Sequence, residues 1–355
     1  MRVVISAGGT GGHIYPALSI LNKIKEEDPS SEFLYIGTTD RMESKLVPEL
    51  GINYYGIEIC GISKNIKKSI KGIYLFFKSI KLCKKKIKEF NPDIVIGVGG
   101  YVTAPVIISA HKLGIKTIIH EQNSIPGKSN KLLVRYTDKI LCSMPRSMSY
   151  FKSNKVVLTG NPRSSEAYNS KGVDRKELGF DNKPIVLIVM GSLGSYTINN
   201  ELKKIVTEFK NKPYNVMLIT GNNYYNEFNM EIPSNVKIYP FINNLVNVLK
   251  TVDLIVTRAG ASTMAEITAI GLPSILVPSP YVANNHQYYN AKEVVDNKGG
   301  LLLEESNFNC KNLLKNIDLI LNDDKLYESM MKETKKLGVV DSLDRIYSII
   351  KELTK

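Results

Sequence analysis

The sequence predicts an α/β protein built from two doubly wound, Rossmann-like domains that face a central crevice. Three observations predict this fold. The chain has 355 residues, more than one ordinary domain uses and enough for two. Short β-branched runs alternate with longer amphipathic stretches in both halves, as in parallel sheets covered by helices on both faces. A turn-forming tripeptide, Gly160-Asn161-Pro162, follows a predicted strand near the middle of the chain.

The first half alternates strands with helices. Its strands are expected at 3–6, 33–36, 94–98, 116–120, 139–142 and 156–159, and its helices at 16–27, 69–90 and 104–113. Continuous apolar runs of this length are typical of buried parallel strands.

The second half repeats this alternation without a close sequence repeat. Strands are expected at 185–190, 215–220, 236–239, 254–257, 274–277 and 300–303, and helices at 198–209, 262–270, 285–296 and 310–321. We therefore expect an N-terminal domain over 1–161 and a C-terminal domain over 162–340. A last helix over about 341–355 is expected to pack back on the first domain.

Composition excludes several classes of protein. With 43% hydrophobic and 23% charged residues, the chain is neither disordered nor a coiled coil. Its four cysteines are widely separated and include no C-x-x-C pair, which argues against a zinc ribbon and a disulfide framework and suits a reducing cytoplasm. We expect no signal peptide and no membrane span, because the N-terminus lacks a basic leader and no apolar run reaches about 20 residues.

The basic residues are unevenly distributed. The net charge is +13, and residues 1–160 hold 24 Lys and Arg against 12 Asp and Glu. The remaining residues hold 23 against 22. The N-terminal half is therefore expected to face an anionic partner, either nucleic acid or an acidic membrane surface.

Much of this charge lies in one predicted helix. Between Lys64 and Lys88 there are ten lysines and no acidic residue. An ordinary helix packed on its sheet with a solvated lysine face is one interpretation. The other is a helix lying on an anionic bilayer, because apolar surface bordered by lysines suits that interface. Its expected membrane-associating residues are Ile70, Lys71, Ile73, Tyr74, Phe77, Lys78 and Ile80.

Three loops in the first half follow predicted strands. They are Gly8-Gly9-Thr10-Gly11-Gly12-His13, Gly97-Val98-Gly99-Gly100-Tyr101 and His120-Glu121-Gln122-Asn123. Parallel strands carry ligands beyond their carboxyl ends, so these loops predict a binding site, although a tight turn could also explain the first. That loop departs from the dinucleotide fingerprint, since Ile14 occupies the third glycine position.

His13 is a candidate general base. It lies at a helix N-terminus, where a positive charge is disfavoured, so the imidazole should stay neutral. Glu121 is the competing candidate. Gly127-Lys128-Ser129 resembles the end of a phosphate-binding P-loop, but Gln122 stands where that motif needs glycine, which argues against a nucleoside triphosphatase.

The second half has comparable strand-to-helix loops. They lie at 190–195 and 257–266, with a polar segment at 284–287. Ser192 and nearby amides could hold a phosphate. Glu266 is either a helix-capping carboxylate in the first turn of its helix or a bidentate acceptor for ribose hydroxyls.

Seven motifs occur in order over nearly the whole chain: GGTGGH, GVGGYVTAP, HEQN, GNPR, GSLGS, RAGASTMAEI and NNHQYYNA. Together they closely resemble the MurG family of glycosyltransferases, which add N-acetylglucosamine to the lipid-linked peptidoglycan precursor. The resemblance implies a GT-B fold whose C-terminal domain binds UDP-N-acetylglucosamine. Its N-terminal domain would bind the membrane and the polyprenyl-pyrophosphoryl-muramoyl peptide, at the cytoplasmic face of the cell membrane.

The resemblance also implies roles for single residues. Ile242 would meet the uracil, Glu266 the ribose, Ser192 and Arg163 the diphosphate, and His286 and Gln287 the sugar. The remaining substrate-binding residues would be Thr10, Gly11, Gly12, Tyr101, Asn123, Ala261, Ser262 and Thr263. No cofactor and no metal site are expected, because amides, a helix dipole and Arg163 could carry the charge of the leaving UDP.

Three other functions stay open at the sequence level. One is a GT-B transferase acting on a diacylglycerol or another polyprenol sugar. Another is a UDP-sugar epimerase of similar architecture. The third is nucleic-acid binding through the lysine helix. Few aromatic residues that could stack on bases lie among the lysines, so we expect no nucleic-acid partner.

Overall fold

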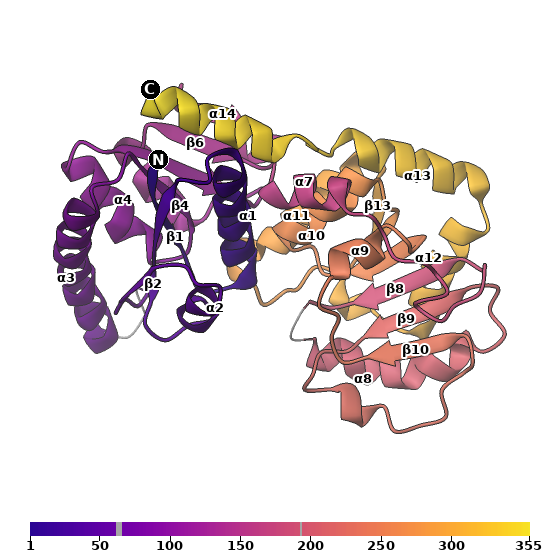
Figure 1. The fold of residues 1–355 in the computed structure, drawn as a ribbon. Coiled ribbons are helices and arrows are strands. Elements are labelled where there is room, and N and C mark those ends of the chain that lie inside the picture. Colours follow the sequence, from indigo (N-terminus) through magenta and orange to yellow (C-terminus); the bar gives the residue numbers. More distant parts are fainter. Residues whose placement is uncertain (62–65, 192–193) are drawn as a thin grey trace. The chain divides into compact units, whose positions relative to one another are not determined.

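The computed structural model describes residues 1–61, 66–191 and 194–355, and the side chains of these apart from residues 66–68. The chain forms two compact units (Figure 1). The N-terminal unit comprises Met1–Arg163 together with Asp341–Lys355, and the C-terminal unit comprises Ser164–Val340.

The N-terminal unit is a parallel sheet in the order β3-β2-β1-β4-β5-β6-β7. Its strands are β1 (Arg2–Ala7), β2 (Glu32–Thr38), β3 (Tyr54–Ile57), β4 (Ile94–Gly99), β5 (Lys116–Glu121), β6 (Lys139–Cys142) and β7 (Val156–Leu158). Its helices are α1 (Gly11–Glu27), α2 (Glu43–Glu49), α3 (Ile66–Phe90), α4 (Thr103–Lys112), α5 (Lys128–Leu133), η1 (Val134–Tyr136), α6 (Pro145–Met148) and α14 (Ser342–Thr354). Helix α7 (Pro162–Asn169) begins at the boundary between the units.

Both faces of this sheet are buried. Val3 and Ile5 of β1 pack with α1 and with Ile346 and Ile350 of α14, which lies beside α1 in Figure 1. Val4 points to the opposite face and joins the core formed with α3 and α4. This alternation explains the continuous apolar sequence of the strand.

The C-terminal unit has a second parallel sheet, in the order β10-β9-β8-β11-β12-β13. Its strands are β8 (Ile185–Val189), β9 (Asn215–Ile219), β10 (Val236–Tyr239), β11 (Leu254–Thr257), β12 (Ser274–Leu276) and β13 (Gly300–Leu302). Its helices are α8 (Tyr196–Ile205), η2 (Val206–Phe209), η3 (Tyr225–Glu227), α9 (Leu245–Leu249), α10 (Ala261–Ile270), η4 (Ala283–Asn285), α11 (His286–Asp296), η5 (Glu305–Asn307), α12 (Cys310–Leu321) and α13 (Asp324–Lys336). The predicted doubly wound α/β class is confirmed.

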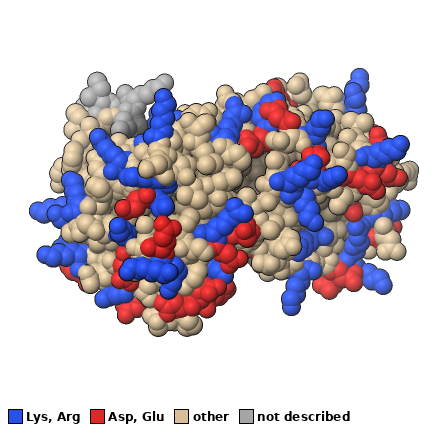
Figure 2. Space-filling view, turned by 90° about the horizontal axis from the view of Figure 1, so that it is seen from above, with Lys and Arg blue, Asp and Glu red and all other residues tan. Residues whose placement is uncertain are grey.

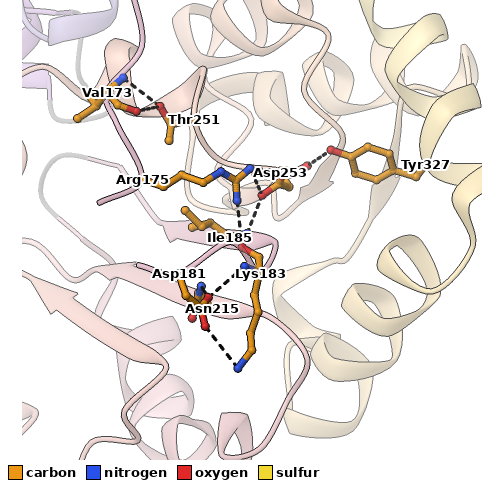
Figure 3. Close-up of polar contacts among 9 residues, drawn as sticks. All are labelled: Val173, Arg175, Asp181, Lys183, Ile185, Asn215, Thr251, Asp253 and Tyr327. Atoms are coloured by element: carbon orange, nitrogen blue, oxygen red, sulfur yellow. Dashed lines mark hydrogen bonds and ion pairs between the residues drawn. The ribbon is translucent and has the colours of Figure 1, made fainter. Parts of the chain in front are cut away.

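A polar cluster fastens the segment before β8 to the amino ends of the strands (Figure 3). Asp253 accepts two hydrogen bonds from Arg175, at 2.8 and 3.0 Å, and one from the backbone N–H of Ile185 at 2.7 Å. The Tyr327 hydroxyl donates to the Asp253 carbonyl at 3.0 Å. This cluster leaves the opposite edge of the sheet, at the carboxyl ends, for the loops that carry the motifs.

Two differences from the sequence prediction lie close to the first glycine loop or its neighbouring strands. Strand β3 was not predicted, because its four residues include Gly56 and give no clear alternation. Helix α1 begins at Gly11 instead of Pro16, which lies inside it. Proline lacks an N–H, so it cannot donate the intrahelical hydrogen bond that the Gly12 carbonyl would otherwise accept.

Candidate functional site

The glycine loops lie at the switch point of each sheet. In the N-terminal unit the strand order reverses between β1 and β4, and in the C-terminal unit between β8 and β11. Ligands of open α/β sheets bind beyond the carboxyl ends of strands at such a point. Each unit therefore presents its motif-bearing loops at the position where its fold can bind a ligand.

In the N-terminal unit the first two loops interlock around His13. The backbone N–H of Gly8 donates to the Gly99 carbonyl at 3.1 Å. Gly99 has a φ of +128°, and a Cβ there would lie 2.5 Å from His13 Cδ2. Only glycine therefore lets the imidazole lie against the second loop. The His13 ring is partly exposed, and its Nδ1 lies 3.2 Å from the Gly8 carbonyl oxygen.

The start of α1 carries the next predicted residues. Thr10 is the N-cap residue but makes no side-chain cap hydrogen bond, and Thr10 and Gly12 are exposed. The first N–H groups of a helix have no intrahelical partner, so this end favours anionic or hydroxyl ligands. Tyr101, in the second loop, is 60% exposed.

Most of the HEQN motif is turned into the protein. His120 is buried, with Nε2 3.0 Å from the Gly160 carbonyl oxygen and Nδ1 2.9 Å from the Gln122 amide nitrogen. Burial lowers the pKa of His120 to about 4, so the ring is neutral at physiological pH. The Gln122 amide also donates to the Val98 carbonyl at 2.6 Å. These two side chains join the end of β4 to the segments that follow β5 and β7.

Glu121 is also buried, and its carboxylate organises its own loop. One oxygen accepts from the backbone N–H and the side-chain amide of Asn123, at 3.0 and 3.3 Å. The other accepts from the N–H of Gly127 at 2.9 Å and the amide of Asn130 at 2.8 Å. Four donors occupy this carboxylate, whereas Asn123 is partly exposed.

In the C-terminal unit, α10 begins directly after β11. Gly260 is its N-cap, and Ala261, Ser262 and Thr263 form its partly exposed first turn. The Ser262 hydroxyl has no hydrogen-bond partner among the described residues. Glu266 is buried and lies in the second turn, not in the first as expected from the sequence. It is therefore not at the N3 position that a capping box requires.

Sequence reasoning gave no role to Arg258, although it follows an apolar strand directly. Its guanidinium is buried and donates to the Ser195 hydroxyl at 2.8 Å and to the Val277 carbonyl at 3.1 Å. The same group lies 2.6 Å from Glu305. Arg258 thus fixes the loop after β8 relative to those after β11 and β12. A charged residue directly after a buried strand was the signal that could have identified it.

The polar segment before α11 presents two further side chains. His286 Nδ1 lies 2.9 Å from the Ala283 carbonyl oxygen, and Gln287 accepts from the backbone N–H of Ser279 at 2.8 Å. Both side chains are partly exposed. Ile242, also partly exposed, follows β10 at the same edge of the sheet.

Ser192 and Arg163 are the two residues predicted to contact the diphosphate. Ser192 lies outside the described residues. Arg163 belongs to the N-terminal unit, and its guanidinium lies 6.0 Å from the centre of the Tyr15 ring on α1. Within the described residues, no three or more His, Cys, Asp and Glu side chains are grouped as metal ligands.

The basic helix α3 keeps an apolar surface in contact with solvent. Leu75 and Cys83 of this helix are buried, whereas Ile70, Ile73, Tyr74 and Phe77 are 50–65% exposed. Lys71 and Lys78 are exposed beside them. Ile80 differs from the expectation, because it is half-buried and packs against the core. Lysine and arginine side chains project along the left edge of Figure 2, the edge that α3 occupies in Figure 1.

The chain matches two family models in succession. Residues 3–142 match the glycosyltransferase family 28 N-terminal domain, and residues 185–346 match the C-terminal domain of the same family. A Bacillus cytotoxicus protein is 46% identical with full coverage of both chains. It is the UDP-N-acetylglucosamine–N-acetylmuramyl-(pentapeptide) pyrophosphoryl-undecaprenol N-acetylglucosamine transferase.

Solved structures share the fold. The crystal structure of Acinetobacter baumannii MurG is 25% identical, with a TM-score of 0.79 and 99% of each chain covered. A UDP-N-acetylglucosamine 2-epimerase from Listeria monocytogenes is 14% identical, with a TM-score of 0.71 and coverage of 99% and 96%. The second likeness shows the fold alone, so sequence identity distinguishes transferase from epimerase here.

No helix in the described ranges is both long enough and apolar enough to span a bilayer.

Proposed function

The chain belongs to glycosyltransferase family 28, and on this premise we propose that its two units divide the donor and the acceptor of one transfer reaction. The protein is a UDP-N-acetylglucosamine transferase that acts on the lipid-linked muramoyl pentapeptide, a precursor of peptidoglycan. The observation that carries this function is identity over the full length of the Bacillus enzyme. The roles proposed for single residues rest on the resemblance of the sequence motifs to the family and are supported by local geometry.

The C-terminal unit binds the UDP-sugar. The Glu266 carboxylate holds the ribose hydroxyls, and Ile242 meets the uracil. The α10 N-terminus, with Ala261, Ser262 and Thr263, binds the diphosphate, a role that the sequence motifs also give to Ser192 and Arg163. The unpartnered Ser262 hydroxyl supports this assignment, because a polar atom left without a partner is costly unless a ligand satisfies it. His286 and Gln287 contact the N-acetylglucosamine.

The N-terminal unit binds the muramoyl acceptor, with Thr10, Gly11, Gly12, Tyr101 and Asn123 around it. His13 is the general base. Its Nε2 takes the proton of the acceptor hydroxyl while the hydroxyl oxygen forms a bond to the anomeric carbon. The bond from that carbon to the UDP oxygen breaks, and UDP leaves with the electron pair. One displacement inverts the anomeric centre, so an α-linked donor gives a β-linked product.

Glu121 serves as a positioning residue in this scheme. Four donors already occupy its carboxylate, including both donor groups of Asn123 and the N–H of Gly127. It holds Asn123 toward the acceptor and is poorly placed to take a proton from it. This geometry favours His13 over Glu121 as the base.

Helix α3 attaches the protein to an anionic membrane surface at the cytoplasmic face. Its exposed apolar residues are each only half to two-thirds exposed, so each gains about 1 kcal/mol when covered by lipid. Each nearby lysine adds about 1 kcal/mol on an anionic leaflet. The sum suits reversible, peripheral binding, which a lipid-linked acceptor requires.

A transfer assay tests the function. The protein is incubated with UDP-N-acetylglucosamine and a short-chain muramoyl-pyrophosphoryl lipid, and we expect UDP and a disaccharide lipid in equal amounts. A UDP-sugar isomer formed without any lipid would instead support an epimerase. Transfer to diacylglycerol in preference to the muramoyl lipid would change the acceptor class.

A further inference from the structure

A buried carboxylate lies behind the first glycine loop. Glu43, the first residue of α2, is completely buried. Its Oε1 accepts hydrogen bonds from the Thr38 N–H at 3.1 Å and the Thr38 hydroxyl at 2.8 Å. Its Oε2 accepts from the N–H of Gly9 at 3.1 Å. No ion pair among the described residues involves Glu43, so its carboxylate is stabilised by these hydrogen-bond donors.

The same peptide group that contacts Glu43 also contacts His13. The Gly8–Gly9 peptide offers its N–H to Glu43 and its carbonyl oxygen to His13 Nδ1, which lies 3.2 Å away. The two groups point in opposite directions from one planar amide. A carboxylate on the N–H polarises the amide and makes its carbonyl a stronger acceptor.

From this arrangement we infer that Glu43 is a positioning residue for catalysis, acting on His13 through the Gly8–Gly9 peptide. The polarised carbonyl holds the proton of His13 on Nδ1. The lone pair is then on Nε2, the atom that removes the proton from the acceptor. This inference deepens the proposed function and rests on the role given there to His13.

The sequence is adapted to the approach of this carboxylate. A Cβ on residue 8 would lie 2.3 Å from Glu43 Oε1, so only glycine fits there. Gly8 thus allows the close approach of the Glu43 carboxylate on one side of the loop, while the loop can bind a ligand on the other side. A purely structural Glu43 would tie the loop after β2 to the loop after β1 and leave the His13 tautomer unaffected.

The tautomer is measured directly by ¹⁵N NMR of the histidine side chains in the intact protein without substrate. The chain has four histidines, and the His13→Ala variant identifies the signals of His13. We expect the Nδ1–H tautomer to predominate in the wild type. A predominant Nε2–H tautomer would overturn the inference before any Glu43 variant is made.

Glu43→Gln is the main variant. A glutamine side chain has one acceptor oxygen, which cannot serve Thr38 and Gly9 in the same way, and its amide opposes one of those donors. We expect the Nδ1–H fraction of His13 to fall in the folded variant. An unchanged tautomer overturns the inference that Glu43 acts on His13 through the Gly8–Gly9 peptide. Should Glu43→Gln not fold, Glu43→Asp, which withdraws the carboxylate by one methylene, is held to the same criterion.

Asp138→Asn is the matched control. Asp138 accepts from the N–H and hydroxyl of Thr117, at 2.8 and 3.1 Å, as Glu43 does from Thr38. Thr117 lies at the amino end of β5, at the sheet edge opposite His13. This substitution should therefore leave the His13 tautomer and kcat unchanged. A matching tautomer change in this control would mean that any loss of stability moves the signal, which overturns the inference.

A double-mutant cycle tests the catalytic consequence. Glu43→Gln should lower kcat about tenfold to a hundredfold, the range seen when a metal-ligating histidine loses its outer partner, with donor affinity unchanged. In the His13→Ala background it should lower kcat no further. Losses that multiply would show that Glu43 acts independently of His13. A wild type without transfer activity would refute the proposed function. The NMR result would still show whether Glu43 sets the tautomer of His13.

Discussion

The guanidinium of Arg258 lies 2.6 Å from the carboxylate of Glu305, from Nη2 to Oε2, and the two side chains are only 10% and 6% exposed. The pair joins the end of β11 to η5, and Arg258 also holds Ser195 at the start of α8. These loops of the C-terminal unit therefore depend on a charge pair of which one member, Glu305, lies outside the sequence motifs.

Removing one member of this pair should be strongly destabilising. Glu305→Ala leaves the Arg258 charge buried without its partner, and we expect the free energy of unfolding to fall by about 3–5 kcal/mol. Urea denaturation measures it. The double variant Arg258→Met/Glu305→Leu should be less destabilised than Glu305→Ala, because no charge stays buried. If the free energy of unfolding of Glu305→Ala falls by less than 1 kcal/mol, the pair does not stabilise this unit.

The buried His120 predicts a dependence of stability on pH. A histidine in the unfolded chain has a pKa of about 6.5, whereas burial lowers that of folded His120 to about 4. Between these values the unfolded chain binds a proton that the folded protein does not. The contribution of His120 to the free energy of unfolding should therefore be fully present above pH 6.5. It should fall by about 3 kcal/mol as the pH is lowered to 4. Urea denaturation over this range measures the slope, which should be smaller in His120→Gln; an equal slope would assign it to other groups.

The positions of most strands along the chain, and of the loops that follow them, could be predicted from the sequence because both follow from local patterns. Buried parallel strands give continuous apolar runs, and their carboxyl ends must share an edge. The function of each polar residue within a loop could not be predicted so well. His120, Glu121 and Asn123 are neighbours in the sequence, yet the first two point into the protein and Asn123 is partly exposed.

Long-range pairing is the physical reason for what was missed. Glu43 and Gly9 are separated by 34 residues and Arg258 and Glu305 by 47, so no local spacing signals either contact. On α3, six of the seven residues expected to meet the membrane are exposed, whereas Ile80 packs against the core. A sequence pattern suggests a face of a helix, whereas the neighbouring elements decide which side chains on it are covered.

The donor assignment predicts a change in ribose recognition. Glu266→Ala should raise the donor KM about tenfold to a hundredfold, because a hydrogen bond to a charged group is worth about 1.5–3 kcal/mol. The selective readout is competition by UDP against 2′-deoxy-UDP. The wild type should prefer UDP, and the variant should bind both alike. Unchanged donor kinetics in a folded variant would leave Glu266 a purely structural residue.

The membrane assignment predicts a loss of vesicle binding. Replacing Ile70, Ile73 and Phe77 by serine should release the protein from vesicles that contain anionic phospholipid, while transfer to a water-soluble acceptor analogue continues. These side chains are half or more exposed, so the fold should persist.

The control for this experiment replaces Leu319 on α12 and Met331 on α13 by serine. These are also exposed apolar residues, at 46% and 39%, but they lie outside the lysine helix. Their substitution should leave vesicle binding intact. If the α3 variant still sediments with vesicles, the membrane-binding surface lies elsewhere.

The final prediction separates the two candidate bases. His13→Ala should lower kcat about a hundredfold to ten-thousandfold, the usual effect of losing a general base, with donor affinity nearly unchanged because UDP is assigned to the other unit. Glu121→Gln should act differently. Its carboxylate holds Asn123, Gly127 and Asn130, so the substitution should lower the melting temperature and raise the acceptor KM more than it lowers kcat. Steady-state kinetics, donor titration calorimetry and thermal unfolding of both variants provide the comparison. Near-normal kcat in His13→Ala, with kcat lost in a stable Glu121→Gln, would transfer the role of base to Glu121.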